Sequence, residues 1–141
     1  MIPSSCSIFV SAFSSPESHF DNFKFWDNVY GFKMPAMKEG KLIDADIHAV
    51  EPTQCEFSSR KRVYNLDCMT ATKKDLSFLS RFSLFLTNRD QSNVISNNAQ
   101  MTISGIVMYF DCELVPGITL STAPEYATHW KQVRLYLKNE I

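Results

Sequence analysis

From Gly40 onward, apolar and polar side chains of this chain alternate with a period of two. Successive side chains of an extended strand point to opposite faces of a sheet, so this period predicts strands. The first such stretch alternates through Ile43, Asp44, Ala45, Asp46, Ile47, His48 and Ala49. Most of the chain is therefore constrained to a mainly β architecture.

Several other segments carry strand patterns rich in β-branched and aromatic residues. They are Cys6–Phe13, Val63–Thr70, Leu76–Thr87, Thr102–Leu114, Ile118–Ser121 and Gln132–Leu137. Thr102–Leu114 is apolar on both faces, which predicts a central strand that is fully covered. The polar segment Asn88–Gln100 is expected to be a long hairpin loop. The sum is an antiparallel β-domain, most simply a barrel or a sandwich.

One segment near the N-terminus has the spacing of a helix instead. Ser15, Pro16 and Glu17 form a helix start, with a hydroxyl cap, a proline in the first turn and an acid near the positive end of the dipole. Aromatic residues then follow at helical steps at Phe20, Phe23, Trp26 and Tyr30, and Gly31 is expected to end the helix. Such a stripe is typical of a core face or of an interface. The short turns that follow favour a projecting arm.

The chain contains only four glycines, and they are widely separated at Gly31, Gly40, Gly105 and Gly117. This spacing excludes the glycine-rich loops that cradle nucleotides and related cofactors. The net charge is −1 and no stripe of Lys and Arg is present, so nucleic acid is not an expected partner. The basic run 60–62 is interpreted as a solvated loop.

Metal, redox and membrane signals are absent from the sequence. The four cysteines form no CxxC pair, and the acids and histidine of the stretch 43–49 are interpreted as a solvated row, so we expect no metal site. No apolar run reaches the roughly 20 residues that span a bilayer, and the N-terminus lacks a signal-peptide pattern. We expect a reduced, soluble, intracellular protein, cytoplasmic or nuclear, with no membrane partner.

Two stretches are specific enough to indicate a family. Residues 25–34 read FWDNVYGFKM, and residues 120–124 and 128–132 read LSTAP and THWKQ. The first resembles the WxxVYGxxM segment of protein arginine N-methyltransferases. The second resembles the THW loop of that family with the strand before it. Both occur in the family's order, with strand patterns between them.

The resemblance implies a domain organisation. Residues 1–14 would be the terminal strand of an absent domain that binds S-adenosyl-L-methionine, residues 15–41 a helical dimerisation arm, and residues 42–141 part of a substrate-binding β-barrel. The expected fold is therefore mainly β, a partial antiparallel β-barrel with an inserted helical arm. The family's glycine motif and its two-glutamate loop match nothing in this chain. S-adenosyl-L-methionine would then be a cofactor of the intact enzyme, with no cofactor-binding residue in this chain.

The resemblance also assigns site residues and partners. His129 would lie at the mouth of the catalytic site, and Thr128 and Trp130 would face the substrate, an arginine-containing protein. The arm would form a homodimer or pair with another arginine methyltransferase through Phe20, Phe23, Trp26, Tyr30 and Phe32. An alternative is a non-catalytic regulatory relative that uses the arm to pair with a full-length methyltransferase.

Overall fold

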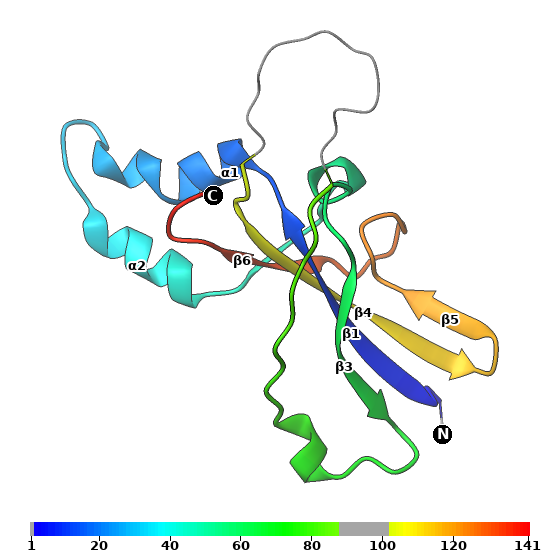
Figure 1. Cartoon of the computed structure of the whole chain (residues 1–141). Coiled ribbons are helices and arrows are strands. Elements are labelled where there is room, and N and C mark those ends of the chain that lie inside the picture. The colour runs from blue at the N-terminus through cyan, green and yellow to red at the C-terminus, as the bar shows by residue number, and fades with distance from the viewer. Residues whose placement is uncertain (1, 88–101) are drawn as a thin grey trace, which may run out of the picture.

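The computed structural model describes residues 2–87 and 102–141 of the chain. Antiparallel strands form a single sheet in the order β2-β6-β4-β1-β3, and β5 pairs with β4 beside this path. The sheet is not closed into a barrel in the described residues, and the α-helices lie to one side of it (Figure 1). The strands are β1 (Ser5–Phe13), β2 (Asp46–His48), β3 (Lys61–Asp67), β4 (Gly105–Val115), β5 (Ile118–Ser121) and β6 (Gln132–Tyr136).

The longest ladder joins β1 to β4, from the pair Ser5 and Glu113 to the pair Phe13 and Gly105. Phe13 is fully buried and packs at the centre of the core, together with Val107, whose side chain is also inaccessible. Gly105 allows β4 and β6 to approach closely, because a Cβ there would lie 2.3 Å from the carbonyl oxygen of Leu135. The core cluster contains Phe13, Phe23, Val50, Val107, Tyr109, Ala123 and Tyr136.

The position of β1 corrects the expected boundary at residue 14. We expected residues 1–14 to be the last strand of a separate domain, but β1 lies between β3 and β4 in the same sheet as the other strands. Its core-facing residues Ser11 and Phe13 are buried against partners from those strands. The first strand is therefore an integral part of the β-domain.

Most of the other predicted strands are present, but one is absent. Strands lie where we expected them at β3, β4, β5 and β6, and β4 is central as predicted. The expectation that β4 is covered on both faces is wrong, since Ile106, Met108 and Phe110 are only half-buried. The expected strand Leu76–Thr87 is absent: Leu76 is the last residue of a preceding 3₁₀ turn, and only Leu86 forms an isolated bridge. The expected hairpin loop Asn88–Gln100 lies outside the described residues.

The arm (residues 15–41) is more broken than its aromatic spacing predicts. α1 (Pro16–Asn22) ends early, the 3₁₀ turn η1 (Lys24–Asp27) follows, and α2 (Pro35–Ile43) begins after a tight turn. In this turn Tyr30 and Gly31 both have positive φ, 51° and 91°, which is the type I′ geometry that glycine favours. Two further 3₁₀ turns are η2 (Pro52–Gln54) and η3 (Lys73–Leu76).

α2 also shortens the first of the predicted strands. We expected a strand from Ile43 to Ala49, but the helix continues to Ile43 and only Asp46–His48 pairs with β6. None of the helices in the described residues has the length and apolar character needed to cross a membrane.

Candidate functional site

The connection between β5 and β6 carries the residues that the sequence analysis singled out. β5 and β6 pair with different parts of the same edge of β4, so the β5–β6 loop (residues 122–131) leaves and returns near Phe110. Thr122 fills the gap between the two ladders. Its backbone N–H and its hydroxyl both donate to the carbonyl oxygen of Phe110, at 2.9 Å each, and its hydroxyl accepts from the N–H of Phe110 at 3.0 Å.

Gln132 anchors the other end of the loop. Its Nε2 donates to the carbonyl oxygen of Thr122 at 2.8 Å, and its Oε1 accepts from the N–H of Val50 at 2.9 Å. Gln132, Thr122 and Ala123 are all buried. A buried amide that satisfies two backbone groups is costly to remove, so this side chain fixes where the loop starts and ends.

Between these anchors, the structure brings Thr128, His129 and Trp130 to the surface. The Thr128 hydroxyl donates to the carbonyl oxygen of Trp130 at 3.1 Å. The His129 and Trp130 rings stack with centroids 4.9 Å apart and planes 8° from parallel, and Trp130 also meets Phe110 edge-on at 6.3 Å. His129 is exposed and Trp130 is 46% exposed, so the loop presents an aromatic wall and an accessible imidazole.

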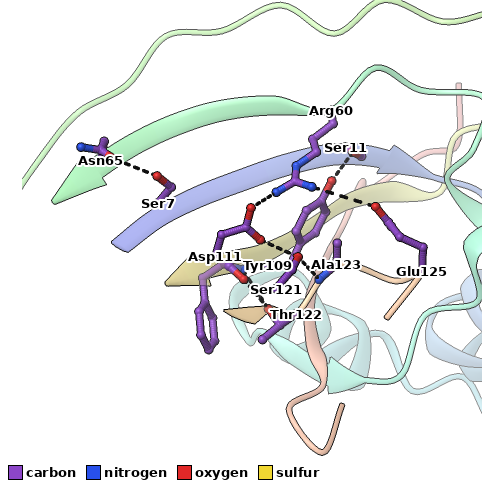
Figure 2. A network of polar contacts seen from close by, with 11 residues as sticks. Ser7, Ser11, Arg60, Asn65, Tyr109, Asp111, Ser121, Thr122, Ala123 and Glu125 are labelled. Carbon is purple, nitrogen blue, oxygen red and sulfur yellow. Dashed lines mark hydrogen bonds and ion pairs between the residues drawn. The ribbon is translucent and has the colours of Figure 1, made fainter. Parts of the chain in front are cut away.

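A charged network supports the start of the same loop (Figure 2). Arg60 forms an ion pair with Asp111 of β4 and lies 4.0 Å from Glu125 of the loop. Its guanidinium is centred 3.8 Å over the Phe9 ring, which is cation–π geometry. Asp111 also accepts from the Ser121 hydroxyl at 2.5 Å. Arg60 is therefore a structural residue and not merely part of a solvated basic run.

A cavity of about 280 Å³ lies beside this network, and Cys55 and Tyr109 are among the residues that line it. Burial, followed by the nearby charge of Glu125, raises the pKa of Cys55 to about 11. Burial also raises the pKa of Tyr109, whose hydroxyl lies 3.1 Å from Ser11 Oγ. Both groups are therefore neutral near pH 7, and the arrangement provides no ready nucleophile there.

The arm residues predicted for an interface have different environments. Tyr30, Phe32 and Phe20 are 97%, 68% and 52% exposed, so their rings are available to a partner. Trp26 is half-buried, and its Nε1 is inaccessible without a hydrogen-bond partner among the described residues. Phe23 is only 5% exposed and lies 5.8 Å from Tyr136 in the core. The structure therefore removes Phe23 from the predicted interface, because the core already buries its ring.

The four glycines do not form a loop that could hold a nucleotide-like cofactor. Gly31 and Gly117 occupy turns with positive φ, Gly40 lies within α2, and Gly105 serves strand packing. None of them brings backbone amides together in a cradle. Within residues 2–87 and 102–141, no group of three or more His, Cys, Asp or Glu side chains is arranged so that it could hold a metal ion.

The residues that hold the loop in place were not predicted from the sequence. Gln132 belongs to the THWKQ stretch, but nothing in its spacing indicates contact with Val50 or Thr122. Arg60 similarly meets its partner Asp111 across 51 positions of sequence. A single sequence gives no signal for such long-range pairs.

The comparisons with known proteins cover nearly the whole chain. A family model described as the arginine methyltransferase oligomerization subdomain matches residues 4–141. The chain is 29% identical to protein arginine N-methyltransferase 1 of Chlamydomonas reinhardtii and to that of Dictyostelium discoideum, over all of its own length and 39% of theirs. It therefore spans about two-fifths of these relatives.

Solved structures agree with this match. A Trypanosoma brucei PRMT1 enzyme–prozyme heterotetrameric complex with AdoHcy superposes with a TM-score of 0.84 and 26% identity, covering 99% of this chain and 42% of that one. Protein arginine methyltransferase 10 of Arabidopsis thaliana superposes with a TM-score of 0.66 and 18% identity, covering 99% and 46%. The second likeness concerns the fold alone.

Proposed function

The chain belongs to the protein arginine methyltransferase family, and on this premise we propose that it forms the substrate-facing part of such an enzyme. The proposed reaction transfers a methyl group from S-adenosyl-L-methionine to the guanidinium of arginine in a protein. The observation that carries the proposal is the β5–β6 loop, which presents His129 and Trp130 on a surface fixed by Thr122 and Gln132.

Guanidinium methylation depends on positioning, because a nitrogen of a planar cation must be aligned with the group it attacks. The flat wall of Trp130 suits contact with the apolar stem or the plane of an arginine side chain. His129 stacks on Trp130, so its imidazole is held beside that wall. Under the proposal, Thr128 limits the motion of this short segment by its hydrogen bond to the Trp130 carbonyl.

The proposal places the methyl donor on residues outside these 141. Two of the four glycines lie in turns with positive φ, Gly40 lies within a helix and Gly105 lies at a close strand contact, and none forms a cofactor cradle. Calorimetry of the 141-residue chain with S-adenosyl-L-methionine should therefore detect no binding at micromolar concentrations. Micromolar binding would overturn this part of the proposal.

A chimera tests the role of the loop. This chain would replace the matching part of the Chlamydomonas relative, and transfer of labelled methyl to an arginine-containing peptide would be measured. We expect His129→Ala to lower kcat/KM at least 10-fold, while His48→Ala, at an exposed histidine on β2, leaves it unchanged. Equal activities of the two variants would contradict the proposed role of the β5–β6 loop in methyl transfer.

A second candidate function is a non-catalytic partner that pairs with a full-length methyltransferase through the arm. The similar Trypanosoma brucei structure is an enzyme–prozyme complex, and the matching family model is described as an oligomerization subdomain. The exposed rings of Tyr30 and Phe32 supply an apolar surface for such pairing.

Co-purification with a full-length relative tests this candidate. We expect the double variant Tyr30→Ser and Phe32→Ser to lower recovery of the complex at least 10-fold. Leu79→Ser is the matched control, since Leu79 is 90% exposed but lies outside the arm. A complex that survives the double variant, or that the control disrupts equally, would rule out the arm as the contact surface.

A further inference from the structure

Three of the four cysteines converge on one face of the sheet. Cys6 of β1 and Cys112 of β4 are direct cross-strand partners, and their Sγ atoms lie 3.2 Å apart. Cys68 follows β3, and its Sγ lies 3.8 Å from that of Cys6. Its backbone N–H donates to the carbonyl oxygen of Ser4 at 2.9 Å, which extends the β1–β3 pairing by one residue.

The strand register explains this convergence. Cys6 pairs with Leu66, so Cys68, two positions further along, is its diagonal neighbour on the same face. The face is opposite to the core cluster, because Cys6 lies an odd number of positions from Phe13. All three cysteines are half-buried, so none is enclosed in the core.

We propose that Cys6, Cys68 and Cys112 form an oxidation site in which a peroxide joins Cys6 to Cys112. One thiolate of the pair attacks a peroxide oxygen, which breaks the O–O bond and leaves a sulfenic acid and, after protonation, a water. The second thiol attacks the sulfenic sulfur, forms the S–S bond and releases another water. Overall, two thiols and one peroxide yield one disulfide and two waters.

Cys68 makes this site a relay, in which the disulfide of Cys6 can be exchanged from Cys112 to Cys68. Because β1 lies between β3 and β4, Cys68 and Cys112 approach Cys6 from opposite sides. The Cys68 thiolate can attack Cys6 Sγ, so that the Cys6–Cys68 bond forms and the Cys112 sulfur leaves with the electron pair and takes up a proton. Cys6 is the shared member of both disulfides.

The ordinary alternative is that half-buried cysteines pack as small apolar side chains. Cys55 is such a residue in this chain, since its Sγ donates to the carbonyl oxygen of Pro52 at 3.4 Å and has no sulfur neighbour among the described residues. It provides an internal control for the cluster. Burial, followed by the hydrogen bond to Cys112, raises the pKa of Cys6, so the reaction is best tested at mildly alkaline pH.

Peptide mapping tests the proposal on the 141-residue chain. Trypsin places the four cysteines on separate peptides, at residues 1–24, 42–60, 63–73 and 90–131. After peroxide treatment at pH 8.5 and alkylation, we expect peptide 1–24 linked to 90–131 or 63–73, while peptide 42–60 stays alkylated. Dithiothreitol should release both links.

Substitutions separate the relay from chance oxidation. Cys112→Ser should move the link entirely to Cys6–Cys68, Cys6→Ser should abolish both links, and Cys55→Ser should change nothing. Links that involve Cys55 as often as Cys6, links only between molecules, or sulfinic acid without any disulfide would overturn the proposal. The wild-type map decides the question even where a variant folds poorly.

Discussion

Gln132 and Thr122 join the two ends of the β5–β6 loop through a buried hydrogen bond of 2.8 Å, in which the side-chain amide donates to a backbone carbonyl. We expect Gln132→Leu to lower the free energy of unfolding by about 2–4 kcal/mol, because it leaves Thr122 O and Val50 N buried without this partner. Urea denaturation would measure the loss.

The control for this prediction is Asn65→Ala. Asn65 accepts from the Ser7 hydroxyl at 2.7 Å, but this bond lies at an exposed surface where water replaces it. We expect a change below about 0.5 kcal/mol. A similar loss in both variants would mean that the Gln132 bonds have no special importance.

Two glycines give opposite predictions for the same substitution. Gly105→Ala should destabilise the protein by about 2–4 kcal/mol, since its Cβ would lie 2.3 Å from Leu135 O and 2.7 Å from Phe13 Cε1. Gly40→Ala should stabilise it by about 0.5–1 kcal/mol, because the position is helical and open. Thermal unfolding of both variants would check the signs, and a tolerated Gly105→Ala would refute the close approach of β4 and β6.

Alkylation of Cys55 should report its buried environment. Folding raises the pKa of this thiol from 9.0 to about 11, so the folded state holds the proton more tightly than the unfolded state. The contribution of the Cys55 thiol to the free energy of unfolding is therefore fully present below pH 9, and it is lost as the pH rises towards about 11. The rate of iodoacetamide labelling should therefore inflect near pH 11 in the folded chain and near pH 9 in urea. The same midpoint in both states would contradict the burial argument.

A predicted strand is present where its residues also have a neighbouring strand to pair with. Ile118–Ser121 has the expected bounds, because Gly117, with φ of 84°, closes a tight hairpin to β4. Leu76–Thr87 has an equally good pattern but forms only an isolated bridge at Leu86, since alternation cannot supply the neighbouring strand that a ladder requires. The predicted aromatic face of a single helix is not formed, because tertiary packing buries Phe23 in the core while Tyr30 lies in an exposed turn.

The sequence indicated which loop carries the candidate site residues, but not which contacts hold that loop in place. The THW residues were found by resemblance, and the structure presents all three on one loop. Gln132 and Arg60 were not found, because their partners Val50 and Asp111 are brought to them only by the complete sheet. Supporting contacts of this kind depend on tertiary packing, which local pattern does not encode.

Substitutions in the exposed part of the β5–β6 loop should lower methyl transfer much more than they lower the free energy of unfolding. His129→Ala removes a stacked but exposed ring, so the free energy of unfolding should change by less than about 0.5 kcal/mol. Trp130→Ala also loses the edge contact with Phe110, and about 0.5–1.5 kcal/mol is expected. Denaturation of the isolated chain and methyl transfer by the chimera would be measured side by side. If His129→Ala lost activity only in proportion to lost folding, the imidazole would be a scaffold residue and the proposed role in the site would fail.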